Sequence, residues 1–339
     1  MYEQMSQINF LGVKRMKKII SLLLVLVMAI GVFALTGCQK KNLKLGLGLS
    51  IAVSATDATA DKEGAGQATV TAAAVLLDKD GKIVKAFIDC ADNKVGYSVD
   101  GKATKNAEFK TKYEYGKDYN MVTYGGAAKE WFEQADAFCS VLVGKTLDEV
   151  KALVAADYKG TEEVVNAGCT IYVSDFVKAV EAAITNAKET TATEADAIKL
   201  GVSTTQTAVD ATEDAAGSNK VETTLFAAAV DADGKVVAGT SDCVEVTFTF
   251  DATGKSTFDA TKEVLSKRAK GDNYGMVAYG GAAKEWYAQA DAFDAACAGK
   301  TATEIAGLMG SDYKGVADVQ AAGCTIYVSG LVKAACKVG

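Results

Sequence analysis

A string of eight residues, Ala-Gly-Cys-Thr-Ile-Tyr-Val-Ser, occurs twice in the chain, at 167–174 and again at 322–329. It lies within a longer repeat that begins near residue 119 and returns 155 positions later. A hydrophobic core tolerates exchange among apolar residues of similar volume, so identity over a short polar string requires a further reason. An accessible hydroxyl can accept a covalent group, so the side chains that could carry chemistry are Thr170 and Thr325.

The absence of histidine removes most catalytic interpretations. Without histidine there is no Ser-His or Cys-His nucleophile pair and no His-ligated zinc or haem. No Cys-x-x-Cys spacing occurs either, so the cysteines give no support for a zinc or iron–sulfur site. No activated base accompanies the threonines. We therefore expect passive attachment points in a protein that has no substrate-transforming site and no metal.

The N-terminus indicates export. Four basic residues at 14–18 precede an apolar run over 19–35, which ends in Leu-Thr-Gly-Cys, the cysteine being Cys38. This tetrapeptide resembles the lipobox of bacterial lipoproteins. The resemblance implies cleavage before Cys38, acylation of its sulfur (palmitate) and a chain anchored by lipid on the extracellular face of the cell membrane. The alternative is an ordinary transmembrane anchor, since the run is almost long enough to span a bilayer. Met16 is an alternative start to Met1.

The rest of the chain is acidic. Without residues 1–38 it carries 32 Lys and Arg against 42 Asp and Glu, a net charge of −10. This charge disfavours nucleic acid and anionic lipid as partners, so we expect contact with the membrane through the lipid anchor only. About 300 residues normally form two domains, in agreement with the repeat. The predicted organisation is a signal peptide, a tether, a first repeat, a Thr-, Ala- and Glu-rich linker and a second repeat, over 1–38, 39–42, 43–185, 186–197 and 198–339.

Both copies predict the same strands in the same order. An Asp-Gly turn joins two apolar strands in each copy, over 70–77 and 83–88 in the first and over 223–230 and 235–238 in the second. Small polar stretches at 54–68 and 208–220 are expected to form surface loops. Each repeat is therefore predicted to be α+β, an antiparallel hairpin-based sheet packed with two or three helices.

Helices follow each hairpin. One apolar stripe has helical spacing, through Trp131, Ala135, Phe138 and Leu142. Trp131 heads this stripe, which favours a place in the core over a role as a stacking partner. Capping boxes at 146–149 and 301–304 begin a further helix in each copy. The β-prone Ile-Tyr-Val after Thr170 predicts a short strand, which would put the threonine turn at the edge of the sheet.

A second identical string, Tyr-Gly-Gly-Ala-Ala-Lys-Glu-Trp, begins at Tyr124 and again at Tyr279. Glycines that open a helix create an anion site from free backbone amides, and a lysine adds positive charge. Such a site could hold a phosphate on Gly125, Gly126 and Lys129, and in the second copy on Gly280, Gly281 and Lys284. The alternative is a close contact between helix and sheet that excludes side chains. The candidates to flank a planar ring are Tyr124, Tyr172, Tyr279 and Tyr327.

The order of lipobox, tandem domain, Tyr-Gly string, Gly-Lys-Thr helix start and late Gly-Cys-Thr turn is similar to the flavinylated lipoproteins of Gram-positive extracellular electron transfer. These resemble FMN-binding domains in which a dedicated flavin transferase links the phosphate of FMN to a threonine hydroxyl. The resemblance covers nearly the whole chain after Cys38, and its specific part is 119–180 with its copy. It implies an electron carrier that receives electrons from a membrane quinol-linked donor and passes them to extracellular acceptors.

The usual flavinylation motif of that family is Asp-x-x-Ser/Thr-Gly-Ala-Thr. Its glycine and acceptor threonine are matched in both copies, by Gly168 and Thr170 and by Gly323 and Thr325. The match implies up to two covalent FMN groups. Each copy departs from the motif in the residue before the glycine, the residue after it and the place of the acid, at Ala167, Cys169 and Glu163 and at Ala322, Cys324 and Asp318.

Two further questions are open from the sequence. Ala-Gly-Cys-Thr is also a common tight turn whose threonine bonds the backbone. The chain would then be a cofactor-free lipoprotein that binds a peptide or glycan in a duplicated groove, or a structural surface protein. The cysteines allow two equivalent disulfides, 90–169 and 243–324, or buried free thiols that act as small hydrophobes.

Overall fold

The computed structural model describes residues 43–339. The predictions of a signal peptide, a tether and lipidation at Cys38 lie outside the described residues. Among the helices of 43–339, none combines the length and the apolar character needed to cross a membrane.

Each half of the described chain contains three long antiparallel strands in consecutive order. The first sheet is built from β1 (Lys44–Thr56), β2 (Gly64–Leu77) and β3 (Ile83–Tyr97), and the second from β5 (Ala197–Val209), β6 (Gly217–Val230) and β7 (Val236–Phe250). A two-residue strand, β4 (Lys188–Glu189), pairs with the start of β1 and lies within the predicted linker. The predicted α+β class, with two similar halves, is confirmed.

The strands extend well beyond the prediction. The stretches expected to be loops at 54–68 and 208–220 contain the real connections only at 57–63 and 210–216, and their ends belong to β-strands. The first strand of each sheet, β1 and β5, was not predicted. β1 begins Lys-Leu-Gly-Leu-Gly-Leu and ends in small residues of alternating exposure, so its own sequence gives a weak strand signal. β1 is stabilised as a strand by its pairing with β2 along its whole length, although its strand propensity is weak.

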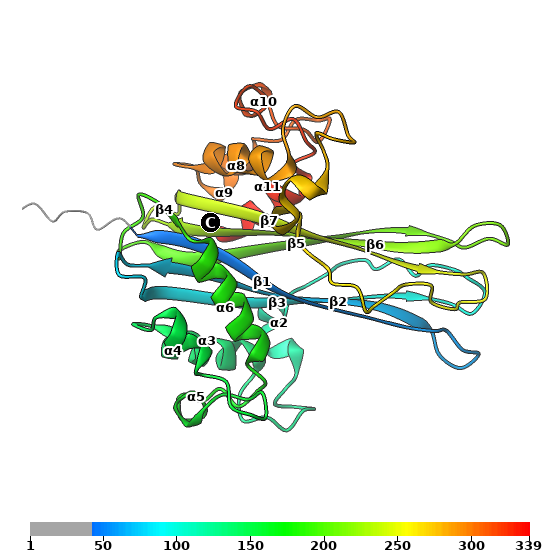
Figure 1. Ribbon diagram of the computed structural model, residues 1–339, viewed down its shortest axis with the longest axis horizontal. Helices are drawn as coiled ribbons and strands as arrows, with labels where there is room; N and C mark the ends of the chain where they lie inside the picture. Colours follow the sequence, from blue (N-terminus) through cyan, green and yellow to red (C-terminus); the bar gives the residue numbers. More distant parts are fainter. Residues whose placement is uncertain (1–42) are drawn as a thin grey trace, which may run out of the picture. The chain divides into compact units, whose positions relative to one another are not determined.

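Each sheet buries both of its faces over the part of its strands that the helices cover (Figure 1). Alternate residues of β2 face opposite ways. Ala73, Val75 and Leu77 pack against helices of the first half, whereas Val70, Ala72 and Ala74 pack against the second sheet. β6 divides in the same way between helices of the second half and the first sheet. The result is four layers, helices–sheet–sheet–helices (Figure 1).

Buried polar groups fix how the two sheets meet. Asn93 donates from Nδ2 to the hydroxyl of Thr223 at 2.9 Å, and Asn219 donates to the carbonyl of Gly96 at 2.9 Å. Gln206 accepts from the amide of Asn106 at 2.8 Å, donates to the carbonyl of Thr104 at 2.7 Å and donates to Asn219 at 2.6 Å. Because a buried polar group without a partner is costly, these bonds select one placement of the sheets.

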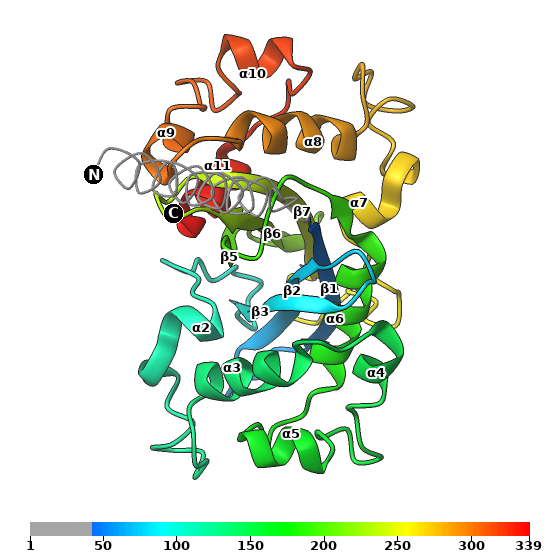
Figure 2. The ribbon, with the colours of Figure 1, turned by 90° about the vertical axis from the view of Figure 1, so that its left-hand side faces the viewer.

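The helices follow the sheets in the same order in both halves (Figure 2). In the first half they are α2 (Lys112–Tyr115), η1 (Gly116–Tyr119), α3 (Trp131–Leu142), α4 (Leu147–Lys151), α5 (Glu162–Ala167) and α6 (Ser174–Asn186). In the second they are α7 (Lys267–Lys270), η2 (Gly271–Tyr274), α8 (Trp286–Cys297), α9 (Ala302–Ala306), α10 (Ala317–Ala321), α11 (Ser329–Ala335) and η3 (Cys336–Val338).

Two sequence predictions about the helices are confirmed. The stripe residues of α3 are all buried, and Trp131 is a core residue only 4% exposed. The capping boxes form at the starts of α4 and α9, where the backbone amides of Thr146 and Thr301 each donate at 2.8 Å to the glutamate three residues later.

The last helix of each half lies directly on the first strand of its sheet. A Cβ atom on Gly48 of β1 would lie 2.0 Å from the backbone nitrogen of Ala183 in α6. A Cβ atom on the equivalent Gly201 of β5 would lie 2.0 Å from the carbonyl oxygen of Ala334 in α11. Glycine is required here because two backbones approach too closely for any side chain.

Gly48→Ala is therefore expected to destabilise the fold by about 1–3 kcal/mol, because the added methyl group pushes α6 away from β1. Chemical denaturation monitored by circular dichroism measures this change. The matched control is Gly307→Ala in the C-cap of α9, where the first half already has Ala152 with the same backbone angles. Equal stability of the two variants would contradict the close-approach argument.

A buried aspartate in each sheet holds the segment that leads toward the helices. Asp89 of β3 accepts from its neighbour's amide, Cys90 N–H, at 2.6 Å and from the amide of Tyr113 in α2 at 3.1 Å. Asp242 of β7 accepts equivalent bonds, together with one from Ser266 at 2.6 Å. Burial is the largest influence on Asp89 and raises its pKa from 3.8 to about 6, although these hydrogen bonds oppose the shift.

The raised pKa gives a pH dependence of stability with a definite sign. Between about pH 4 and 6 the folded chain binds more protons at Asp89 than the unfolded chain, so its contribution to stability falls as the pH rises. Asp89→Asn removes this titration. Relative to wild type, the variant should gain about 2–3 kcal/mol of unfolding free energy between pH 4 and pH 7. Urea titrations at several pH values test this, and an equal pH dependence of the two proteins would contradict it.

Candidate functional site

The two threonines lie on the outer helical layers. Thr170 is in the loop between α5 and α6, and Thr325 is in the loop between α10 and α11. Both residues are exposed. These helices lie on the outer sides of the two sheets (Figure 1). The predicted strand after each threonine is wrong, since 171–173 form only one bridge, between Tyr172 and Lys159. No further strand lies beside this segment, and the chain enters α6 directly. The expected place at the edge of the sheet is therefore also wrong.

A buried glutamine side chain accepts two hydrogen bonds from each threonine. The backbone amide and the hydroxyl of Thr170 both donate to Oε1 of Gln134 in α3, at 2.8 and 3.0 Å. Thr325 makes the same pair of bonds to Gln289 in α8, at 2.9 and 3.0 Å. Each glutamine is only 1% exposed, so its amide is fixed in the helix layer and determines where the threonine hydroxyl lies.

The glutamine also connects the threonine to a lysine. Nε2 of Gln134 donates to the carbonyl oxygen of Lys129 at 3.0 Å, and Gln289 donates to that of Lys284 at 2.9 Å. This bond fixes the backbone just before α3, from which the lysine side chain extends. One amide group thus positions both the hydroxyl and the cation of the site.

The lysine ammonium group lies against the glycine that ends α5. Gly168 has φ +104° and forms the left-handed C-cap of that helix. A Cβ atom on Gly168 would lie 2.1 Å from Nζ of Lys129, and one on Gly323 would lie 2.2 Å from Nζ of Lys284. The backbone conformation requires glycine here, and the absence of a side chain leaves room for the lysine ammonium group. The positive charge of the lysine therefore lies beside the glycine that is two residues before each threonine.

The glycine pair at 125–126 does not open a helix, contrary to the prediction. α3 begins at Trp131, and its N-cap residue is Glu130, which has a buried carboxylate. The same carboxylate accepts from the amides of Met121 and Val122, at 2.8 and 3.2 Å, and folds the intervening loop back. Glu285 does the same in the second half. The prediction that these glycines form an anion site at the start of a helix is therefore wrong.

The glycines instead shape an exposed loop. Gly126 has φ +65°, as does Gly281, and a Cβ atom on Gly125 would lie 2.7 Å from the carbonyl oxygen of Met121 in the same loop. The alternative of a close contact between helix and sheet therefore does not describe these residues. The loop carries Tyr124, which is 85% exposed, and its copy Tyr279 is 92% exposed.

The remaining predicted tyrosines are also exposed, Tyr172 at 67% and Tyr327 at 69%. Each follows its threonine by two residues and lies on the same outer layer. Tyr172 and Tyr327 are available to contact a ligand attached at the threonine. They cannot be core residues.

The cysteines beside the threonines are buried free thiols. Cys169 and Cys324 have no exposed surface, and all seven cysteines of the described chain are free. Burial raises the pKa of both thiols to about 11, so they are protonated at neutral pH. Cys169 and Cys324 thus fill a core position that suits a small side chain.

Sequence reasoning missed Gln134 and Gln289 as site residues. The available signal was a polar residue, identical in both copies, on the buried face of a helix headed by tryptophan. Its partner is 36 positions away, which the sequence does not reveal.

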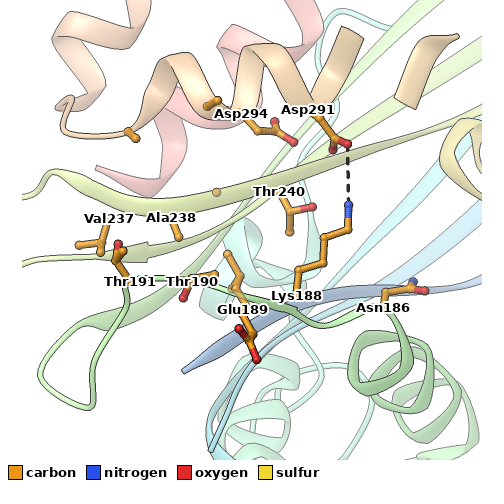
Figure 3. Close-up of a pocket in the computed structure, with 14 residues that line it drawn as sticks. Asn186, Lys188, Glu189, Thr190, Thr191, Val237, Ala238, Thr240, Asp291 and Asp294 are labelled. Carbon is orange, nitrogen blue, oxygen red and sulfur yellow. Dashed lines mark ion pairs between the residues drawn. The ribbon is translucent and has the colours of Figure 1, made fainter. Parts of the chain in front are cut away.

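The threonines do not line the hollow drawn in Figure 3. That hollow, of about 360 Å³, lies between the segment around β4 and the second half, at residues that include Lys188, Thr240 and Asp294. Lys188 and Asp291 form an ion pair across it at 3.7 Å. Within residues 43–339, no group of three or more acidic or cysteine side chains is arranged to hold a metal ion.

Each half therefore presents a hydroxyl, a nearby cation and exposed aromatic rings at the surface.

Comparison of the chain with protein-family models, with curated proteins and with solved structures finds no match.

Proposed function

We propose that this protein is a lipid-anchored electron carrier on the extracellular face of the cell membrane, with one FMN ester-linked to Thr170 and another to Thr325. One observation carries the proposal. Both halves present an exposed threonine hydroxyl on a buried glutamine, with a lysine ammonium group beside the glycine two positions earlier.

The residues present fit a flavin phosphodiester. Esterification leaves the phosphate with one negative charge, and Lys129 or Lys284 supplies the nearby positive charge. Because the hydroxyl is on the surface, a modifying enzyme has access to it. The exposed Tyr124 and Tyr172 offer aromatic faces to the ring system, as do their copies Tyr279 and Tyr327. The bound flavin would supply the electron-transfer chemistry.

The chain itself does not activate the hydroxyl. Its hydrogen-bond acceptor is the amide oxygen of Gln134 or Gln289, which orients the proton but is too weak a base to remove it. A threonine in this setting depends on an external catalyst, which agrees with a dedicated flavin transferase as partner. Gln134 and Gln289 therefore act as positioning residues.

A covalent bond also suits the proposed location. A protein on the outer face of a membrane loses a dissociable cofactor to the surrounding medium, whereas an ester retains it. The electron donor would be a membrane quinol-linked protein, and the acceptors would be extracellular. The proposal assigns no substrate-transforming site to the chain.

A flavin transferase can move FMN from FAD to the hydroxyl, with AMP as the leaving group and the hydroxyl proton released to solvent. Coexpression with such an enzyme is expected to add two FMN groups to the chain, each with the mass of FMN less water. Thr170→Ala and Thr325→Ala should each remove one mass, and the double variant should remove both, because each hydroxyl is a separate attachment point. Intact-mass spectrometry measures this directly. The exposed Thr261→Ala is the control and should keep both masses. If the wild-type chain gains no FMN mass, the electron-carrier proposal is wrong and a cofactor-free binding module takes its place.

Gly168→Ala is expected to abolish FMN incorporation at Thr170 and leave incorporation at Thr325 intact. Alanine is strained at φ +104°, which alters the turn that leads to Thr170, and its methyl group makes the Lys129 ammonium group move. The second half, which carries no substitution, is the internal control. Lys129→Met separates the two effects, since it removes the charge without straining the backbone and should slow incorporation at Thr170. Full incorporation at Thr170 in both variants would show that the cation is not part of the site.

A further inference from the structure

Two tyrosines have a backbone conformation that tyrosine disfavours. In the described chain the residues other than glycine with positive φ are Asn120, Tyr158 and Tyr313, at +61°, +66° and +63°. Asparagine suits this left-handed conformation, and the equivalent of Asn120 in the second half is Gly275 at φ +80°. At 120 and 275 the two copies thus use the residue types that carry little strain. At 158 and 313 both copies use tyrosine.

Packing does not explain this choice. Tyr158 is 65% exposed and Tyr313 is 60% exposed, so little of either ring is removed from water. A strained backbone persists only where the surrounding structure determines it, and such residues gather at functional sites. Asparagine or glycine would fit the same turn with less strain. Neither packing nor backbone preference therefore accounts for tyrosine at these two positions.

Local hydrogen bonds hold the strained turn in the same way in both halves. The amide of Tyr158 donates to the carbonyl of Ala155 at 3.0 Å, and the amide of Lys159 donates to the carboxylate of Asp157 at 3.2 Å. The copies of these bonds, at Tyr313 and Lys314, measure 3.1 Å each. The conformation is thus built into the fold and does not depend on a ligand.

The turn lies beside the segment that carries the threonine. The carbonyl of Tyr158 accepts from the amide of Val173 at 3.0 Å, and that of Tyr313 accepts from the amide of Val328 at 2.9 Å. Lys159 and Tyr172 form the bridge next to this bond. Tyr158 therefore stands across from a residue only three positions after Thr170, on the same exposed layer.

We propose that Tyr158 and Tyr313 are cofactor-contacting residues, each of which presents its ring to a planar aromatic group attached at the neighbouring threonine. This inference rests on the proposed function and names side chains that no sequence motif indicated. A tyrosine ring is rigid and has few rotatable bonds, so fixing its backbone places an aromatic face at low entropic cost. The left-handed turn sets the direction from which that face is presented.

The test uses the full chain with Thr325→Ala, so that only Thr170 accepts FMN, and adds Tyr158→Asn. Loss of a stacking ring is expected to raise the fraction of unquenched flavin fluorescence roughly fivefold, as time-resolved emission measures it. Tyr158→Trp should restore the quenching. The matched control is Tyr115→Asn, an exposed tyrosine of α2, which should leave the fluorescence unchanged.

A second measurement needs no cofactor. Tyr158→Asn relieves the strained backbone, so the unmodified chain should melt about 2 °C higher than its parent. A lower melting temperature would show that Tyr158 is a structural residue and would overturn the inference.

Intact mass separates failure of this inference from failure of the proposed function. If the parent carries one FMN but Tyr158→Asn and Tyr115→Asn give equal fluorescence, only the role of Tyr158 is overturned. If the parent carries no FMN, the proposed function is overturned and this inference with it.

Discussion

Burial of both faces of each sheet is the constraint on which the rest of the structure depends. A strand such as β2 has apolar or alanine side chains on both sides, so it needs a partner layer above and below. Helices of the same half cover one face, and the other half of the chain covers the opposite face. Neither half can satisfy its sheet alone. The duplicated chain therefore folds as one four-layer body, and its helical layers become the two outer surfaces.

This arrangement decides where chemistry can lie. α3 is fixed on the first sheet by its apolar stripe, and α8 is fixed on the second by the equivalent stripe. Gln134 and Gln289 occupy the same buried faces of these helices, so their amides are as rigid as the core. The threonine loops rest on those amides. Each candidate site is therefore a surface hydroxyl placed by a core residue, which combines access for a modifying enzyme with a fixed position.

The sequence predicted what depends on local signals and missed what depends on contacts. The Asp-Gly turns, the stripe that begins with Trp131 and the capping box at Thr146 follow from neighbouring residues, and all were predicted. β1 was missed because Gly46 and Gly48 weaken its strand signal, and only the approach of α6 explains them. The glycines at 125–126 were wrongly expected to open α3. The helix starts later because the loop from Met121 folds back onto Glu130, a contact that the sequence does not reveal. The hydrogen bond of Gln134 to Thr170 spans 36 positions and has no local signature.

The pattern of identity between the two halves separates structural from functional constraint. Where the sheets face each other, the copies differ. The polar contact residues Asn93, Gln206, Asn219 and Thr223 have as their equivalents Val246, Val53, Gly66 and Val70. Two surfaces that pack against each other must be complementary, so the two halves have different residues at this interface.

At the threonine sites the copies are identical in every residue that forms the constellation. Gly168, Lys129, Gln134 and Thr170 all belong to the first half, and their copies all belong to the second, so the two sites place no demand of complementarity on each other. An exposed hydroxyl also contributes little to the stability of the fold. One modifying enzyme that acts on both threonines, or one kind of ligand held at both, would supply a constraint that keeps both sites the same.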